Sequence, residues 1–200
     1  MRQGGRVARR TFSRAELDSF RDAAVPDLLP NRPGQRLRLL FVGINPGLWT
    51  AATGTHFAHP GNRFYPALLA GGVITTPIDP ADGMDEDQRD VLRQRGIGIT
   101  NIVHRATAKA SELSAAELRT GGAELMALVA REEPAVVAIA GITAYRTAFA
   151  APKATAGRQP ARWGASELWV VPNPSGLNAH ETVDSLARAY AEVGRAAGLL

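Results

Sequence analysis

The amino-acid sequence predicts an α/β fold, a three-layer α/β/α sandwich with a central four-stranded parallel sheet. Four short apolar runs lack the alternation of polar and apolar residues, which is typical of strands that are covered on both faces. Helical stretches separate these runs, and strands that alternate with helices favour parallel pairing. The four predicted strands lie at residues 39–42, 97–103, 135–140 and 168–171.

Length and composition indicate one globular domain. The chain has 200 residues, of which 45% are hydrophobic, and this suffices for a full core. The absence of cysteine excludes disulfides, thiolate nucleophiles and cysteine-ligated zinc. No apolar run approaches the about 20 residues that span a bilayer, and the first residues lack the apolar stretch of a secretory signal. We expect a cytoplasmic protein without membrane contact and, since nothing indicates a dimer surface, a monomer.

The charge of the chain is modestly basic. The formal net charge is +4 and the pI is about 10.1, which permits an anionic partner such as nucleic acid but is shared by many unrelated enzymes. Residues 1–12 contain four arginines and few apolar side chains. We expect them to form a flexible basic tail, either simply solvated or acting as a loose phosphate-binding arm. Residues 13–200 form the predicted domain.

Helix signals recur along the chain. Ser13 and Glu16 have the spacing of a capping box, which predicts a helix to about residue 24, and prolines make residues 25–36 a connector. Ser114 and Glu117 have the same spacing at the head of an amphipathic stretch. The other predictions are a helical turn at 64–70, a short helix that ends before Gly96, helices at 114–131, 143–149 and 181–197, and a Pro/Gly-containing loop at 151–164 that carries Lys153, Arg158 and Arg162.

Two loops that follow predicted strands are rich in Asn, Pro and Gly. One spans residues 43–64, after the first strand, and the other spans 172–178, after the fourth. Because ligands of α/β sheets bind beyond the carboxyl ends of strands, these loops form the candidate site. Neither contains a Walker loop, a dinucleotide-binding glycine turn or a serine nucleophile elbow. His56 and His59 have no nearby carboxylate in the sequence, so we expect no metal site.

The first loop reads Gly-Ile-Asn-Pro-Gly at 43–47 and Phe-Ala-His-Pro-Gly-Asn-Arg-Phe at 57–64, and the second reads Asn-Pro-Ser-Gly-Leu at 173–177. These motifs closely resemble those of the mismatch-specific uracil-DNA glycosylases, the Mug/thymine-DNA-glycosylase branch of the uracil-DNA glycosylase superfamily. Shorter similarities extend the resemblance over about residues 25–195. The resemblance implies a uracil-DNA glycosylase-like fold and a double-stranded DNA partner that contains a mispaired or damaged base.

The resemblance implies a monofunctional enzyme, free of metal and organic cofactor, that hydrolyses the N-glycosidic bond of uracil mispaired with guanine and so starts base-excision repair. In that family the asparagine at the position of Asn45 holds the hydrolytic water. A carboxamide cannot act as a base near neutral pH, but its carbonyl can orient water. In a dissociative reaction the base leaves first as an anion, so electrostatic stabilisation of that anion should be the main catalytic effect. No lysine stands beside either motif in the sequence, which argues against Schiff-base chemistry.

The resemblance also implies which residues bind the extruded base. Phe57 has the place of the aromatic ring that stacks on the base, because a flipped base loses its stacking in the duplex. Ile44 corresponds to a residue that binds the pyrimidine edge through its backbone. Asn173 and Asn101 complete the expected base-binding set. Neighbouring Asn62 and Arg63 are expected to fix their loop rather than to touch the base.

The second loop corresponds to the loop that penetrates the duplex. Leu177 would act as the wedge that fills the space left by the flipped nucleotide, and Ser175 suits a phosphate contact. Gly176 and Asn178 would offer polar groups to the orphaned partner base, which favours guanine there. An ordinary turn at a strand end would explain the Pro and Gly but not an exposed leucine.

Three positions depart from the best-known Mug-type sequences. Ala179 stands where those sequences have an arginine, and His180 or Arg162 could replace its contact with the partner strand. Asn101 stands where they have a lysine. Trp49 replaces a small residue, and so either narrows the pocket or packs beneath it.

Three alternatives therefore remain open at the sequence level. One is a glycosylase of broader range that takes xanthine, hypoxanthine or etheno-adducts, and a second is a catalytically silent lesion-binding protein. A third is a hydrolase of free nucleosides, which the wedge residue Leu177 and the basic residues of 151–164 disfavour, because a small substrate needs neither.

Overall fold

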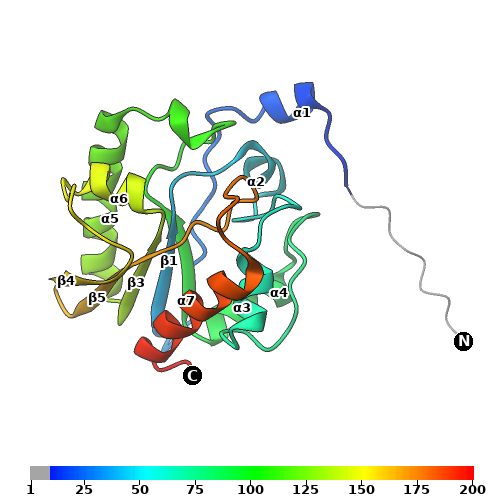
Figure 1. Ribbon diagram of the computed structural model, residues 1–200. Coiled ribbons are helices and arrows are strands. Elements are labelled where there is room, and N and C mark those ends of the chain that lie inside the picture. Colours follow the sequence, from blue (N-terminus) through cyan, green and yellow to red (C-terminus); the bar gives the residue numbers. More distant parts are fainter. Residues whose placement is uncertain (1–9) are drawn as a thin grey trace, which may run out of the picture.

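A computed structural model describes residues 10–200, and its strands form one five-stranded sheet in the order β2-β1-β3-β5-β4 (Figure 1). Strands β2, β1, β3 and β5 run parallel to one another, and β4 pairs antiparallel with β5. The strands are β1 Leu39–Gly43, β2 Ile97–Asn101, β3 Val136–Ala140, β4 Gly157–Trp163 and β5 Ser166–Val171. The α/β class is thus confirmed, and the four predicted strands are the four parallel ones.

The predicted number of strands is wrong, because residues 151–164 are not simply a loop. Gly157–Trp163 form the edge strand β4, which a two-residue turn at Gly164 connects to β5. Pro160 and the irregular register between Arg158 and Arg162 interrupt the pairing. Proline cannot donate to a ladder of backbone hydrogen bonds, so a strand of this kind is tolerated at the edge of a sheet but is difficult to recognise in the sequence.

Helices cover both faces of the sheet (Figure 1). The predicted capping boxes are present, since Ser13 accepts a hydrogen bond from the backbone of Glu16 and Ser114 accepts one from Glu117. The first helix ends earlier than predicted, and the short helix after Gly47 was not predicted. The helices are α1 Arg14–Asp18, α2 Leu48–Thr53, α3 Phe64–Ala70, α4 Glu86–Gln94, α5 Ala115–Glu132, α6 Ile142–Ala148 and α7 Val183–Ala196, with a 3-10 turn at Ala110–Glu112.

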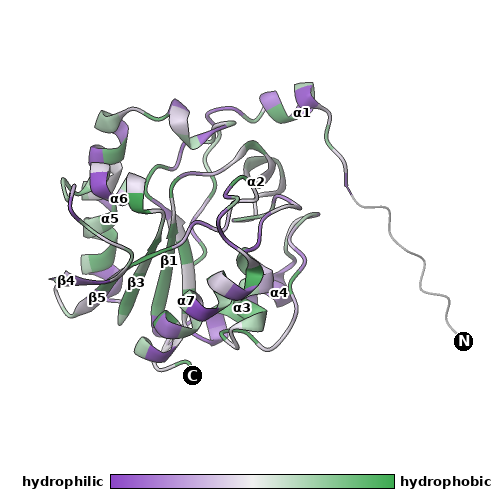
Figure 2. Ribbon diagram, viewed as in Figure 1, coloured by the Kyte–Doolittle hydropathy of each residue, from purple (hydrophilic) through white to green (hydrophobic). Residues whose placement is uncertain are grey.

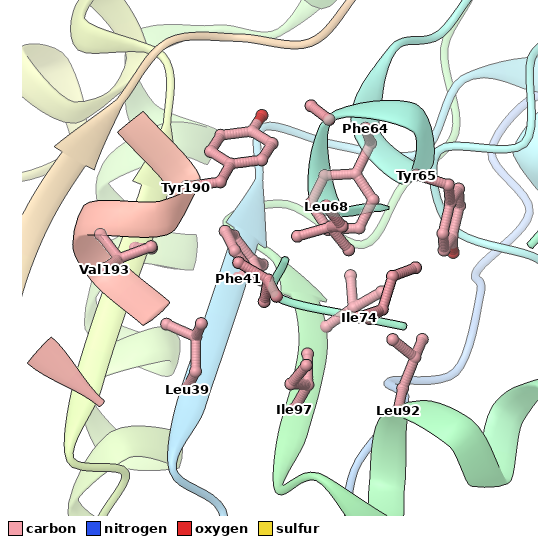
Figure 3. Close-up of a cluster of buried hydrophobic side chains, with 14 of the residues drawn as sticks. Leu39, Phe41, Phe64, Tyr65, Leu68, Ile74, Leu92, Ile97, Tyr190 and Val193 are labelled. Carbon is pink, nitrogen blue, oxygen red and sulfur yellow. The ribbon is translucent and has the colours of Figure 1, made fainter. Parts of the chain in front are cut away.

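The core consists of two apolar clusters, one on each face of the sheet. Successive side chains of a strand point to opposite faces, so Leu39 and Phe41 pack with α3 and α7, whereas Leu40 and Val42 pack with α5 and α6. Figure 3 shows the first cluster, in which the rings of Phe41 and Phe64 lie 5.0 Å apart in edge-to-face contact. The central strands β1 and β3 are accordingly green, the hydrophobic colour, in Figure 2.

The parallel strands bring their carboxyl ends to one edge of the sheet, at the top of Figure 1. The loops that follow β1, β2 and β5 therefore meet there, although they are far apart in the sequence. Among residues 10–200, no helix is both long and apolar enough to cross a membrane.

Candidate active site

A cleft of about 890 Å³ opens where the loops after β1, β2 and β5 meet. Of the predicted site residues, only Asn178 does not line it, because its side chain donates instead to the backbone carbonyl of Asn173 (3.2 Å). The structure thus brings together residues that are up to 133 positions apart, since Ile44 and Leu177 line the same cleft. The predicted residues that line it are Ile44, Asn45, Phe57, Asn101, Asn173, Ser175, Gly176 and Leu177.

The carboxamide of Asn45 is held by its nitrogen. Its Nδ2 donates to the backbone carbonyls of Pro46 (3.1 Å) and Arg105 (3.0 Å) and to Oγ1 of Thr107 (2.7 Å). The Thr107 hydroxyl donates its own proton to the carbonyl of Lys109 (2.9 Å), so it accepts from Asn45. Because carbonyls only accept, the NH₂ group must face them. The carbonyl oxygen of Asn45 is therefore left to orient a molecule in the cleft.

The carboxamide of Asn101 is held from behind by a buried histidine. Nε2 of His56 lies 3.0 Å from the carbonyl of Pro26, which can only accept, so this nitrogen carries the proton of the neutral ring. Nδ1 of His56 then accepts from the Asn101 amide at 3.2 Å. Burial lowers the pKa of His56 and so favours this neutral form. The carbonyl oxygen of Asn101 lies over Gly43, where any Cβ would overlap it.

Asn173 is held the opposite way round. Its Oδ1 accepts from the backbone N–H of Ser175 (3.0 Å), so the oxygen of this carboxamide is occupied. Its Nδ2 lies on the side of Gly141, 3.7 Å from the position that a Cβ there would take. Asn173 lines the cleft with a hydrogen-bond donor, whereas Asn45 and Asn101 offer acceptors. Each of these three carboxamides is therefore anchored at one end.

Phe57 forms an aromatic wall of the cleft. Its ring stacks on that of buried Phe64, with centroids 4.1 Å apart and planes inclined by 24°. The backbone of Phe57 has φ +56°, a conformation that costs free energy in a bulky residue and that tertiary contacts must enforce. Beside it, the carbonyl of Ile44 accepts from the N–H of Val103 (2.9 Å), so a ligand contact through the Ile44 backbone would use its N–H.

The loop after β5, residues 172–181, which we call the wedge loop, presents Leu177 to solvent. This side chain is 87% exposed, the most exposed of the large hydrophobic side chains among the described residues. The loop is shaped by short-range bonds from the N–H of Asn178 to the carbonyl of Ser175 (2.9 Å) and from the N–H of Leu177 to Oγ of Ser175 (3.3 Å). It lies directly against the first loop, since a Cβ at Gly176 would come 2.6 Å from the carbonyl of Gly61.

Trp49 lies in the wall of the cleft rather than beneath it. Its indole N–H donates to the carbonyl of Ala81 (2.9 Å), and its ring makes edge contacts with Phe12 (4.9 Å) and His59 (5.7 Å). Part of the expected basic tail, residues 1–9, lies outside the described residues. Its end is docked, because Phe12 packs on Trp49 and the N–H of Arg10 donates to Asp82 (2.6 Å).

Sequence reasoning missed several cleft residues. Thr107 anchors Asn45 across 62 positions of sequence, so nothing local marks it. Lys109 also lines the cleft, although no lysine stands beside either motif in the sequence. The capping pattern at Ser114 and the strand at 97–103 bracket this segment and were the only signals that it is ordered near the site.

The basic residues of 151–164 do not reach the cleft. Arg158 donates to Glu167 (2.9 Å), and Arg162 lies 3.5 Å from the same carboxylate. In the β4–β5 pairing Arg162 is opposite Glu167, near the start of β5, whereas the wedge loop follows its far end at Val171. Arg162 therefore cannot replace the missing arginine at position 179, and it is no evidence for a nucleic-acid surface at the cleft.

The two histidines of the first loop are engaged in hydrogen bonds. His56 bonds to Pro26 and Asn101, and Nδ1 of His59 accepts from the N–H of Gly61 (3.0 Å). No cluster of three or more His, Cys, Asp or Glu side chains within residues 10–200 has the arrangement of a metal site. The polar side chains that line the cleft include the carboxamides of Asn45, Asn101 and Asn173, the ammonium of Lys109 and the hydroxyls of Ser111 and Ser175.

Two comparisons with known proteins match most of the chain. The sequence profile of the Uracil DNA glycosylase superfamily matches residues 31–194, which include the cleft loops. Among solved structures, the fold is similar to the solution NMR structure of a candidate uracil DNA glycosylase from Methanosarcina acetivorans, with a TM-score of 0.60. That match covers 88% of this chain and 98% of the other, at 16% sequence identity.

Proposed function

The chain belongs to the uracil DNA glycosylase superfamily, and we propose that it hydrolyses the N-glycosidic bond of uracil, preferably mispaired with guanine, in double-stranded DNA. The observation that carries this proposal is the set of three carboxamides, each anchored at one end and directed to the cleft with the other. Acceptors and a donor in fixed positions suit a reaction that needs an oriented water and a stabilised leaving group. Release of the base would start base-excision repair.

The proposed reaction begins with departure of the base. As the bond between the sugar C1′ and the base nitrogen breaks, both bonding electrons leave with the base, and the sugar becomes oxocarbenium-like. The Nδ2 donor of Asn173, whose oxygen is held by Ser175, would stabilise the base anion by a hydrogen bond without proton transfer. Water then adds to C1′ and loses a proton to solvent. The Oδ1 of Asn45, whose carboxamide is fixed by three acceptors around its nitrogen, orients that water.

Recognition of the base follows from the orientation of Asn101. Uracil has an N–H at ring position 3, and the carbonyl oxygen of Asn101 is the matching acceptor. Cytosine has an unprotonated nitrogen there, so it would meet acceptor with acceptor and leave both unpaired. Phe57 would stack on the base with the ring face that Phe64 does not cover, an interaction worth about 1–3 kcal/mol, and the N–H of Ile44 would bind a ring carbonyl.

Duplex opening would depend on the wedge loop. Leu177 would enter the base stack in place of the flipped nucleotide, and Gly176 and Asn178 would bind the partner base. Ser175 would contact a phosphate. We propose a monofunctional enzyme, in which water rather than Lys109 adds to the sugar. Asn45 is anchored and can orient a water, whereas Lys109 is an exposed residue in the wall of the cleft.

A broader range of bases is the second candidate function. Hypoxanthine and xanthine also carry a ring N–H beside a carbonyl group, so the acceptor of Asn101 does not distinguish them from uracil. The cleft of about 890 Å³ does not restrict the substrate to a pyrimidine. Trp49 in the cleft wall is the residue whose ring would limit the larger bases.

The test uses an end-labelled duplex with one uracil opposite guanine, incubated with wild type or Asn45→Ala in EDTA and then treated with hot alkali. We expect alkali-dependent cleavage at uracil by the wild type and much less by the variant. Cleavage without alkali would contradict a monofunctional enzyme. Binding without cleavage would overturn the proposed uracil activity, and duplexes with hypoxanthine or xanthine would then separate a broader-range glycosylase from a silent lesion-binding protein.

A further inference from the structure

We propose that Arg63, which belongs to the first loop, is the positioning residue that holds the wedge loop ready to enter a duplex. This inference rests on the proposed function of the cleft. The sequence predicts only that Arg63 fixes its own loop. In the structure its hydrogen bonds run instead to the wedge loop, which is more than 100 positions away in the sequence.

The contacts of Arg63 span the whole wedge loop. Its backbone N–H donates to the carbonyl of Pro174 (3.0 Å). Its Nη2 donates to the carbonyls of Ser175 (2.6 Å) and Asn178 (2.7 Å), and its Nη1 donates to the carbonyl of Glu181. One planar guanidinium thus binds three carbonyls, two of which flank Leu177. The rigid fork of arginine can fix several acceptors at once, which a lysine ammonium does less well.

The tip of the wedge loop has little other support. Leu177 is 87% exposed, so apolar packing does not determine its position. Below the tip, Gly176 packs against the carbonyl of Gly61, two residues before Arg63. The position of the wedge loop relative to the first loop is therefore set by this close approach of Gly176 to Gly61 and by the hydrogen bonds of Arg63.

The charge of Arg63 is also unusual. Among residues 10–200, no carboxylate lies within ion-pair distance of its guanidinium, and its Nε is buried without a hydrogen-bond partner. Burying a cation that only carbonyl dipoles compensate costs free energy. The positive charge would strengthen the binding of DNA by the wedge loop, because a cation directly beneath Ser175 and Asn178 favours the approach of a DNA phosphate.

A prepositioned wedge should matter only when base pairs must be opened. Ordering a loop during binding consumes binding free energy, and a loop that is already ordered avoids this loss. Uracil in an unpaired bubble needs no wedge, so its hydrolysis depends only on the residues of the cleft that bind the base and orient the water. Loss of Arg63 should therefore reduce hydrolysis of paired uracil far more than hydrolysis of unpaired uracil.

The test compares wild type, Arg63→Met and Arg63→Lys on two substrates, a duplex with one G·U pair and the same sequence with uracil in an unpaired bubble. Arg95→Met is the matched control, because Arg95 is the other arginine in residues 10–200 with a buried, unpartnered Nε and it donates to Leu199, away from the cleft. For Arg63→Met we expect kcat/KM to fall about 10- to 100-fold on the paired substrate, as for loss of hydrogen bonds from a charged group. On the bubble we expect a change within about threefold, and Arg63→Lys should recover only part of the loss.

Duplex opening is also read directly, by the fluorescence of 2-aminopurine beside the uracil in an Asn45→Ala background. We expect a smaller or slower rise with Arg63→Met than with the Asn45→Ala protein alone, and no change with Arg95→Met. Equal losses on both substrates, full recovery by Arg63→Lys, or an unchanged fluorescence signal would overturn the role of Arg63. Failure of the proposed function would be seen differently, as no uracil release by the wild type from either substrate, and the fluorescence comparison would still decide the role of Arg63.

Discussion

Residues 43–64 and 151–164 are both stretches interrupted by Gly and Pro, but the polar side chains of the two stretches have opposite roles in the structure. In 151–164 the two arginines are paired within the protein, since Arg158 and Arg162 both lie within ion-pair distance of Glu167 across the edge hairpin formed by β4 and β5. In 43–64 the carboxamide of Asn45 is bound at its nitrogen and directs its oxygen into the cleft. Composition is therefore a poor guide to function here.

The difference lies in how completely the polar groups are satisfied. The cleft loops use hydrogen bonds to Thr107, His56 and Ser175 to hold one end of a carboxamide and keep the other end available. Such preorganisation is what an electrostatic catalyst needs, because its groups do not have to reorient during the reaction. The edge hairpin places no side chain that is hydrogen-bonded at one end and free at the other in the cleft. Variants of the two regions should accordingly differ in effect.

Of the variants that separate the cleft from the edge hairpin, Asn173→Ala should lower the rate of uracil release most. The donor that would face the departing base is lost, and removal of one such donor typically lowers kcat about 10²- to 10³-fold. The single-turnover rate of uracil release from a G·U duplex measures this. A rate within threefold of wild type would show that the cleft does not use this carboxamide, and the contrast with the hairpin would lose its basis.

His56→Gln should have an intermediate effect, a change in the free energy of unfolding that depends on pH. Burial lowers the pKa of His56 from its ordinary value of 6.5, and the charge of His104 lowers it further. The hydrogen bond to Pro26 and the charge of Asp27 raise it, but by less than burial lowers it. Below pH 6.5 the unfolded chain binds this proton more readily than the folded one, so the wild type loses stability as the pH falls, by at most about 1.4 kcal/mol per pH unit.

The substitution removes this proton and so should make the free energy of unfolding less dependent on pH below 6.5. Above that pH the histidine contributes no such slope, because it is neutral in both states. Urea unfolding of both proteins at several pH values measures the difference. Parallel stability curves between pH 5 and 7 would contradict the assignment of a buried neutral His56 behind Asn101.

Arg162→Ala should have the smallest effect. Its side chain is half exposed and shares Glu167 with Arg158, so its loss should change stability by less than about 1 kcal/mol and leave uracil release unchanged. Thermal unfolding and the same single-turnover assay measure both. A clear loss of duplex affinity would place DNA on the edge hairpin and remove the distinction between the two regions.

The sequence was informative where the physical signal is local. Apolar runs identify the four parallel strands, and the spacing of Ser114 and Glu117 identifies the start of α5. Strand β4 was missed because Pro160 and the alternation-free pattern around it read as a loop, and its pairing partner only becomes evident in the fold. Helix α2 was missed because it begins directly after Pro46 and Gly47, residues that usually indicate a loop.

The site follows the same rule. Asn45, Phe57, Asn173 and Leu177 could be named because they lie within two compact motifs. Thr107 and the role of His56 could not, since both act through contacts that span 45 or more residues of sequence. The hydrogen bonds of Arg63 to the wedge loop are more distant still. The contacts that could not be predicted from the sequence are thus those that hold the catalytic and base-binding residues in place.

The most direct test of the central claim, that an anchored Asn45 orients the attacking water, is the single-turnover rate of uracil release from a G·U duplex in EDTA. Wild type and Asn45→Ala are compared at saturating enzyme, with duplex affinity measured in parallel. We predict a rate about 10²- to 10³-fold lower for the variant with affinity within about threefold, because the substitution removes a catalytic group and not the wedge. Equal rates would contradict the account, and the water would then have to be held by another group in the cleft.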